Sequence, residues 1–368
     1  MSELYPAERL TRAQQEAGRQ GVDALLLTPG ADLRYLTGYD ALPLERLTCL
    51  VLPAQGDPLL LVPRLEEPAA RSSPAGELGV EIRPYDETDD AFALVAGLIA
   101  GAGVVGVADR MWAEQVLAFR TALPDSRQVL AGGVLRGLRL IKSPAEVAAL
   151  RRAGEAIDSV HERMGQWLRA GRTEAEVARD VAEAVVEGHE QVNFTIVAAG
   201  PNAASPHHHT GDRVIAPGDP VVVDIGGTTA DGYCSDITRV YAVGEPPVDF
   251  VRYYDVLQRA QVAAYEAVRP GVAAAVVDAA ARDIIAEAGY GDYFVHRTGH
   301  GIGLEEHEEP WIVAGNDEPL QAGMVFSIEP GIYLPGRHGA RIEDIVACTE
   351  AGGELLNLVS RDLVVVGG

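Results

Sequence analysis

The sequence predicts two domains, an α/β domain at residues 1–135 and an α+β domain at residues 136–368. Three observations predict this arrangement. Helical and strand patterns alternate through the first domain, as they do in layered α/β structures. A strong helix-start signal at Ser143 opens a new segment, which places the join near residues 132–142. The 368 residues are also more than a single compact domain commonly holds.

The elements of the first domain follow from periodicity and from turn residues. An amphipathic helix is expected at residues 6–21, where Gly21 ends it. Short apolar runs bounded by proline or glycine predict strands at 22–28, 47–53, 58–63 and 80–85. The run from Ala91 to Ala108 has no polar side chain, but four glycines interrupt it, so we expect a soluble helix at about 88–100 and a strand at 104–108 rather than a membrane span. A helix at about 112–121 follows.

The second domain begins with a capping box. Ser143 and Glu146 flank Pro144 at the first helical position, which predicts a long helix from Ser143 to about Ala170. Thr173 and Glu176 repeat the box and predict a helix that ends at Gly188. Two further helices are expected at about 247–268 and 272–288, and the remainder has the pattern of strands and loops.

Composition excludes some classes of function. The net charge of −24 repels phosphate backbones, so no nucleic-acid partner is expected. The cysteines, Cys49, Cys234 and Cys348, are odd in number and far apart, which argues against a disulfide framework or a thiolate zinc site. The N-terminus has no basic segment followed by an apolar one, so we expect a cytoplasmic protein without a secretory signal or a membrane partner.

Four carboxylates interrupt apolar strand patterns. Asp224 ends the run VVVD, and Asp236 lies in YCSDITRVYAV, beyond glycines that permit the strands to pair. Glu329 in FSIEPGIY and Glu343 in ARIEDIVAC repeat this form on either side of a second reversal. A buried lone carboxylate is unfavourable by several kcal/mol, and the nearby arginines are too few to pair with all four. The pattern therefore predicts one or two bound divalent cations.

His300 adds a nitrogen ligand. It lies in TGHGIG, where the flanking glycines let other groups approach closely. One imidazole with four carboxylates favours Mn²⁺, Co²⁺, Fe²⁺ or Zn²⁺ over Ca²⁺, and two such ions about 3.5–4 Å apart would activate water. Each residue alone has a commoner structural explanation, as a paired core charge or a strand end, but five in one domain favour the metal site.

These motifs resemble the pita-bread metallopeptidases, which include methionine aminopeptidase, aminopeptidase P and prolidase. The resemblance rests on D-I-G-G, C-S-D-I-T-R, T-G-H-G-I-G, S-I-E-P-G-I-Y and R-I-E-D, and covers about Ser143 to Leu363. ADLRYLTGY resembles the creatinase-type N-terminal domain of the proline-specific members. The resemblance implies a creatinase-like domain before a pita-bread catalytic domain. It implies two metal ions, manganese first and cobalt or zinc as alternatives. Asp224 would bind one, His300 and Glu329 the other, and Asp236 and Glu343 both.

Further residues take roles by the same resemblance. Glu329 would serve as general base and then acid, and His207 and His307 would stabilise the tetrahedral intermediate. His208 and His209 are chemical alternatives to His207, but the spacing to Asp224 favours His207. The other expected site residues are His296 near the substrate proline, Arg341 as the residue orienting Glu343, and Tyr333 as an aromatic neighbour.

The implied reaction is hydrolysis of the bond preceding proline in short peptides, by a hydroxide that two metal ions activate, in a homodimer. The two-domain length favours an Xaa-Pro dipeptidase (prolidase). Aminopeptidase P is the alternative, and a non-catalytic or creatinase-like homologue is the alternative from another class. Familiar archaeal-type prolidases carry an arginine where this sequence has Trp311. A dipeptidase would then need another cation for the substrate carboxylate, and Arg46, from an N-terminal loop of the same or a partner subunit, and Arg337 are the candidates.

Overall fold

The join between the two units lies between Arg139 and Leu140 in the computed structural model, which describes residues 3–367. The sequence analysis placed it at 135/136. The difference arises from helix α6 (Gly132–Leu140), which was not predicted and of which every residue except Leu140 belongs to the first unit. The Tyr35 hydroxyl donates to the carbonyl of Leu138 at 2.8 Å, and Arg139 pairs with Asp32 at 2.7 Å.

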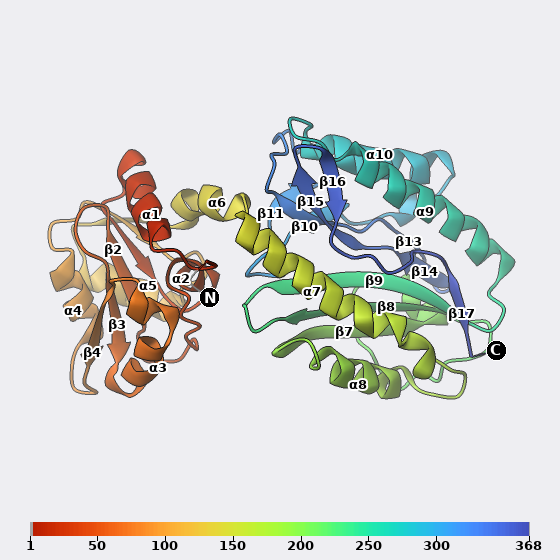
Figure 1. Ribbon diagram of the computed structural model, residues 1–368, viewed down its shortest axis with the longest axis horizontal. Coiled ribbons are helices and arrows are strands. Elements are labelled where there is room, and N and C mark those ends of the chain that lie inside the picture. The colour runs from red at the N-terminus through yellow and green to blue at the C-terminus, as the bar shows by residue number, and fades with distance from the viewer. Residues whose placement is uncertain (1–2, 368) are drawn as a thin grey trace. The chain divides into compact units, whose positions relative to one another are not determined.

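The first unit is built on a mixed sheet, which confirms the α/β class. Its described residues form six strands in the order β4-β3-β2-β1-β5-β6. These are β1 (Ala24–Leu27), β2 (Cys49–Pro53), β3 (Leu59–Pro63), β4 (Glu81–Tyr85), β5 (Val104–Val107) and β6 (Arg127–Leu130). The other helices are α1 (Glu8–Arg19), α2 (Ala31–Thr37), α3 (Glu67–Ser72), α4 (Ala91–Leu98) and α5 (Ala113–Ala122) (Figure 1). The sequence analysis did not predict α2, α3 or β6, which are too short for periodicity to show.

The apolar run from Ala91 to Ala108 divides as expected. Helix α4 and strand β5 take its two ends, and Gly101 adopts a positive φ of 90° in the turn between them. Such a backbone conformation favours glycine, which explains why the run does not continue as one helix. No helix within residues 3–367 is long and apolar enough to cross a membrane.

The second unit combines helices with antiparallel sheets. Its helices are α7 (Pro144–Glu162), α8 (Glu174–Val185), α9 (Val248–Ala267) and α10 (Ala274–Glu287). Its strands are β7 (Gln191–Ala199), β8 (Pro220–Thr228), β9 (Cys234–Val243), β10 (Gly299–Gly301), β11 (Glu308–Ile312), β12 (Val325–Ile328), β13 (Gly331–Leu334), β14 (His338–Arg341), β15 (Asp344–Thr349), β16 (Gly352–Leu355) and β17 (Val364–Val366). In Figure 1, α7 crosses one side of the β7–β8–β9 sheet, and α9 and α10 lie beside β10–β16.

Both capping boxes form as predicted. The Ser143 hydroxyl accepts from the amide of Glu146, and the Thr173 hydroxyl accepts from the amide of Glu176. Each glutamate carboxylate in turn accepts from the amide of its serine or threonine. The predicted extension of the first helix to Ala170 is wrong, because α7 ends at Glu162 and a 3-10 turn follows. Met164 in that turn and Leu168 just after it are buried in the core to which α8 also contributes. The apolar residues that suggested a longer helix are therefore buried in a 3-10 turn and the loop after it.

Strand β8 explains how a charge comes to lie within an apolar run. Successive side chains of a strand point to opposite faces. Val221 and Val223 pack into the core beside α7 and α8, whereas Val222 packs into the core beside α9 and α10. Asp224 follows on the same face as Val222. It is directed between the two sheets, where the other candidate residues lie.

Candidate metal centre

The five predicted metal ligands converge on one place. Three overlapping groups have donor atoms within 4.8 Å of one another. They are Asp224, Asp236 and Glu343; His300, Glu329 and Glu343; and Asp236, His300 and His307. Asp236 and Glu343 each belong to a group with Asp224 and to a group with His300. The arrangement therefore offers two adjacent positions for a cation.

Strand register brings the two aspartates together. In the antiparallel β8–β9 pair, Asp224 lies opposite Thr238 and Gly226 lies opposite Asp236. Paired residues share a face and residues two apart share a face, so both carboxylates are diagonal neighbours on one side of the sheet. This is the pairing that the glycines between the strands led us to expect.

The two glutamates lie where a second hairpin is interrupted. Strands β12 and β15 pair as far as Ile328 and Asp344, and pairing resumes between β13 and β14 at Gly331 and Arg341. Glu329 and Glu343 occupy the two sides of the gap, so the expectation that they lie inside strands is wrong. Because the backbone at these two residues is not held in strand pairing, both glutamate side chains can turn toward the aspartates.

Arg341 is the only arginine bonded to the carboxylate cluster among the residues described. Its guanidinium donates to Oδ2 of Asp224, to the Tyr333 hydroxyl at 2.8 Å and, through Nε, to Thr238 at 3.0 Å. Thr238 in turn donates to Glu343 at 2.8 Å. Oδ1 of Asp224 is buried without any hydrogen-bond partner in the described chain. A buried carboxylate oxygen left in this way is expected to face a cation.

The electrostatics show how unfavourable the cluster is without a cation. Burial, then repulsion from Glu343 and Asp224, raises the pKa of Asp236 well above its usual value. Burial and the charges of Glu329 and Asp224 do the same for the pKa of Glu343. Burial raises the pKa of Glu329 to about 7, although Arg341 and Arg297 lower it. The donor set of four carboxylates and an imidazole thus fits divalent metal ions, which would compensate this charge.

His300 is held tightly in strand β10. Its amide donates to the Ser327 hydroxyl at 3.0 Å, and its Nε2 lies 3.4 Å from Glu329 and 3.7 Å from Asp236. Burial lowers its pKa to about 3, which keeps the imidazole neutral as metal binding requires. A side chain at Gly299 would collide with the carbonyl of Ser327, so the close approach expected at this glycine is present.

The cluster opens into a cavity of about 540 Å³. The five ligands line it together with Phe194, Ile196, Pro206, His207, His296, Arg297, Glu306, His307 and Arg341. The predicted His207, His296, His307 and Arg341 are therefore brought together with the metal ligands. Tyr333 lies behind them, with its hydroxyl 2.9 Å from Nε2 of His296. A cavity of this size accommodates a short peptide rather than a folded chain.

The three consecutive histidines have different environments. His207 lines the cavity. His208 instead points to Glu174, with Nε2 2.9 Å from Oε2, and Glu174 has no exposed side-chain surface. His209 is exposed. Of the three, His207 is therefore the one beside the candidate ligands, and its role stays a prediction.

Arg297 is a cavity residue that the sequence analysis did not single out. Its guanidinium carbon lies 4.3 Å from the centre of the Trp311 ring. Phe194, Ile196 and Glu306 were missed as well, because nothing in their local pattern separates them from other strand and loop residues. A cation three positions before the candidate ligand His300 was the available signal for Arg297.

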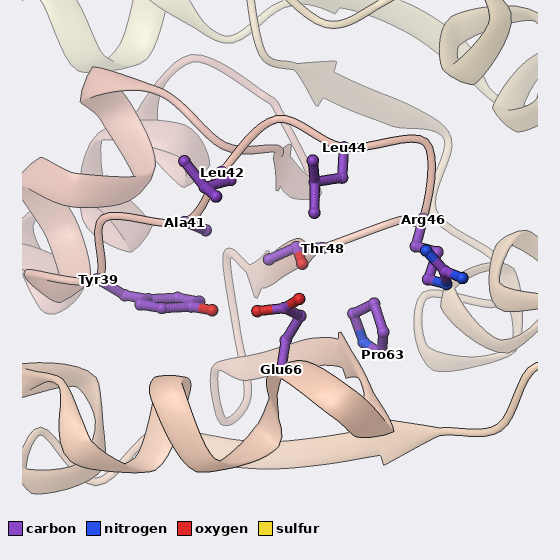
Figure 2. A pocket seen from close by; sticks show the side chains of 8 residues that line it. All are labelled: Tyr39, Ala41, Leu42, Leu44, Arg46, Thr48, Pro63 and Glu66. Atoms are coloured by element: carbon purple, nitrogen blue, oxygen red, sulfur yellow. The ribbon is translucent and has the colours of Figure 1, made fainter.

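The two arginines proposed for the substrate carboxylate have ion-pair partners in the described chain. Arg337 is exposed and paired with Asp249, and it does not line the cavity. Arg46 belongs to the first unit, where it pairs with Glu45 and with Glu87 at 2.7 Å. Figure 2 shows it at the edge of a small pocket that includes Tyr39 and Glu66, with Leu42 and Leu44 on the adjoining loop.

Comparisons with known proteins agree with this geometry. Residues 148–350 match the model of metallopeptidase family M24, and residues 9–141 match the creatinase/prolidase N-terminal domain. "Probable dipeptidase PepE" of Mycobacterium tuberculosis is 54% identical over 367 residues, 99% of this chain and 97% of the relative. The structure of dipeptidase PepE from Mycobacterium ulcerans is 54% identical with a TM-score of 0.93, covering 100% of this chain and 99% of that one. A prolidase from Thermococcus sibiricus is 37% identical with a TM-score of 0.91, covering 97% and 98%.

These matches confirm the resemblance to the pita-bread metallopeptidases and the creatinase-like character of the first unit. They span nearly the whole chain and both units. The chain therefore belongs to metallopeptidase family M24, in the branch whose catalytic domain follows a creatinase/prolidase N-terminal domain, and it is a peptidase.

Proposed function

We propose that this peptidase hydrolyses the peptide bond preceding proline in Xaa-Pro dipeptides, with two divalent metal ions at the carboxylate cluster. The observation that carries the proposal is the convergence of five metal donors in one cavity that His207, His296 and His307 also line. The names of the relatives, dipeptidase and prolidase, support the same substrate class.

The ligand assignment follows the overlapping groups. Asp224 would hold one ion through its unpartnered Oδ1, and His300 and Glu329 would hold the other. Asp236 and Glu343 would serve both, since each occurs in groups with Asp224 and with His300. Bound there, divalent ions supply Lewis-acid activation of water and of the scissile carbonyl.

The chain's own residues move the protons and orient the substrate. Glu329 receives the proton of the attacking water and delivers it to the departing proline nitrogen. One of its oxygens accepts from Ser327 at 3.3 Å, which fixes the carboxylate toward the cavity. His207 and His307 donate hydrogen bonds to the carbonyl oxygen as negative charge develops on it.

Arg341, Tyr333 and His296 form a connected set behind the substrate. The Tyr333 hydroxyl is 2.8 Å from Arg341 and 2.9 Å from His296, so Tyr333 connects these two cavity residues and restrains both. We place the proline ring near His296. The bond before proline has no N–H, so a site that recognises the ring needs no backbone hydrogen bond at that position.

A cleavage panel tests the proposal. Purified protein is stripped with a chelator, reloaded with Mn²⁺, Co²⁺ or Zn²⁺, and given Ala-Pro, Ala-Ala and Ala-Pro-Ala. Hydrolysis of Ala-Pro that the chelator abolishes and metal restores is expected, with Ala-Ala left intact. Turnover that resists chelation would support a creatinase-like, metal-free reaction and contradict the two-metal proposal.

Trp311 is the observation that keeps a second candidate open. The resemblance implied a carboxylate-binding arginine at its position, and without one the site has less reason to reject longer peptides. An aminopeptidase that removes the residue before proline from longer chains would cleave Ala-Pro-Ala faster than Ala-Pro. The tripeptide arm of the panel therefore decides between the two.

Manganese is the ion that we propose first, because an oxygen-rich donor set with one imidazole suits it, and cobalt and zinc satisfy the same set. Elemental analysis of protein purified without added metal tests this choice. A homodimer and a cytoplasmic location remain predictions from the resemblance and the composition. Light scattering on the full chain measures the oligomeric state.

A further inference from the structure

We infer that Arg297, held against Trp311, binds the free carboxylate of the substrate's C-terminal proline. This inference rests on the proposed dipeptidase function and supplies the cation that the sequence lacks at position 311. It replaces Arg337 and competes with Arg46 for that role.

The availability of the Arg297 guanidinium is the first argument. Arg297 and Arg341 are the two arginines, among the residues described, that line the cavity. The guanidinium of Arg341 is already engaged by Asp224, Thr238 and Tyr333. That of Arg297 has no hydrogen-bond or ion-pair partner in residues 3–367. A guanidinium presents five N–H donors in a planar fork that matches a carboxylate, so a cavity arginine without a partner is equipped for an anionic ligand.

The backbone around Arg297 fixes its position. The neighbouring carbonyl of His296 accepts from Arg282 at 2.8 Å, and the Thr298 hydroxyl donates to Asp278 at 2.7 Å, so both flanking residues are tied to α10. The Thr298 carbonyl also accepts from the amide of Glu329 at 2.8 Å. The residue after Arg297 is therefore hydrogen-bonded to the backbone of Glu329, the proposed general base.

Trp311 fixes the side chain. In the β10–β11 pair, Trp311 lies directly opposite His300, so the indole projects from the same face as the metal-binding imidazole. Its ring stacks on the guanidinium of Arg297 at 4.3 Å. Stacking of this kind restrains the long side chain while leaving its N–H edge open to a ligand. The indole of Trp311 therefore positions the guanidinium of Arg297 instead of supplying a cation itself.

The chemistry at the two ends of the substrate agrees with this placement. The scissile carbonyl must lie at the metal ligands, and the carboxylate of an Xaa-Pro dipeptide lies only one residue beyond it. Arg297 lines the same cavity as His300 and Glu329, which places its cation within that reach. Its positive charge also lowers the pKa of both groups. Longer peptides place an uncharged amide at the same position, so they lose the interaction.

Paired substrates test the inference. Steady-state kinetics on metal-loaded protein compare Ala-Pro with Ala-Pro-NH₂, which keeps the ring and removes the charge. Arg297→Met keeps the aliphatic stem over Trp311, and Arg297→Lys keeps the charge. The Met variant is expected to lose about 10- to 100-fold in kcat/KM for Ala-Pro, through KM, and less than about 3-fold for the amide. The Lys variant should lie between it and the unmodified chain.

A binding measurement provides a readout independent of turnover. Calorimetry with L-proline and L-prolinamide should show that the unmodified chain prefers the acid and that Arg297→Met abolishes this preference. Trp311→Ala should weaken the preference without changing kcat for the amide. Arg259→Ala, an exposed arginine on α9, is the matched control and should leave both substrates unaffected.

The outcomes separate the inference from the proposed function. If the unmodified chain cleaves Ala-Pro but Arg297→Met affects acid and amide equally, the inference is overturned and the dipeptidase proposal stands. The inference is also overturned if Arg46→Ala produces the acid-selective loss and the Arg297 variants do not. If the unmodified chain does not cleave Ala-Pro, the proposed function itself fails.

Discussion

The carboxylate of Asp224 is divided between two kinds of partner: Oδ2 accepts from the guanidinium of Arg341, and Oδ1 is buried without a partner. Arg341 also reaches Glu343 through Thr238. One arginine thereby orients candidate ligands on both sides of the cluster and supplies part of the positive charge that offsets the carboxylates. Stability and activity should respond differently when the guanidinium is removed.

Arg341→Met is expected to lower kcat by about 10- to 100-fold, because Asp224 and Glu343 lose the groups that orient them. In metal-free protein it should also lower the free energy of unfolding by about 3–5 kcal/mol, since buried carboxylates lose their cation. Metal loading should recover much of this stability but not the activity. Calorimetric melting with and without Mn²⁺, alongside kinetics, measures both effects.

Arg341→Lys is the matched variant. It retains the charge, so metal-free stability should recover, but one ammonium cannot contact Asp224, Thr238 and Tyr333 together, so kcat should stay low. Equal activity in the Lys variant and the unmodified chain would contradict the orienting role.

Asp236→Asn is expected to have opposite effects on stability in the two metal states. Without metal, the change removes one of several mutually repelling buried carboxylates, so the melting temperature should rise by about 2–4 °C for each kcal/mol gained. With metal, it removes a ligand, so the stabilisation by Mn²⁺ should shrink and turnover should be lost. Melting curves across a metal titration measure this reversal.

Asp255→Asn, at an exposed helix position, controls for the loss of one negative charge. It should change the melting temperature of the metal-free and the metal-loaded protein by the same amount. A metal-free Asp236→Asn protein that melts below the unmodified chain would argue that repulsion between the carboxylates is not the main destabilising effect in the cluster.

The histidine triplet should separate into three phenotypes. His207→Ala should lower kcat by about 10²- to 10³-fold with little change in melting temperature, because it removes a donor in the cavity. His208→Ala should destabilise the fold by about 1–3 kcal/mol, because the fully buried Glu174 loses a partner. The remaining bonds of Glu174, from the Ala199 amide at 2.7 Å and from Asn202, should keep the loop folded.

His209→Ala is the built-in control, since an exposed side chain should change stability by no more than about 0.5 kcal/mol. Kinetics and urea unfolding on the three variants test the assignment. Activity lost in His209→Ala and retained in His207→Ala would reverse it.

We expect His161 to account for part of the loss of folding stability at acid pH. It is buried, with Nδ1 2.9 Å from the Tyr241 hydroxyl. Burial lowers its pKa to about 3, so the unfolded chain takes up its proton first as the pH falls. Stability is complete above the unfolded pKa of about 6.5 and declines below it, by about 2 kcal/mol at about pH 5.

His161→Phe retains a ring beside Tyr241 and removes the titration. Its free energy of unfolding should start lower at about pH 8, because the bond to Tyr241 is lost, and then fall less steeply toward about pH 5. Urea unfolding in chelator, with His209→Ala as control, measures the slope. Parallel slopes in His161→Phe and the unmodified chain would assign the acid sensitivity to other groups.

The candidate metal ligands could be singled out from the sequence because their signal is local. Asp224 and Asp236 stand in apolar strand patterns, and His300 stands between glycines, so each conflicts with its surroundings in a way that burial alone does not explain. The helix starts were local in the same sense, since a capping box is complete within four residues. The end of α7 was not, because Met164 and Leu168 are buried by contacts from distant strands.

What the sequence by itself indicated, then, was the class of each domain, the candidate metal ligands and, through its resemblance, the family, because pattern, spacing and misplaced charge are all present along the chain. Only the tertiary structure decided that His207 lies in the cavity while His208 bonds to Glu174, and that Arg297 stacks on Trp311 beside His300. The physical reason is strand register and side-chain direction. The pairing of β10 with β11 sets residues eleven positions apart face to face, and nothing in the letters around Arg297 or Trp311 specifies that pairing.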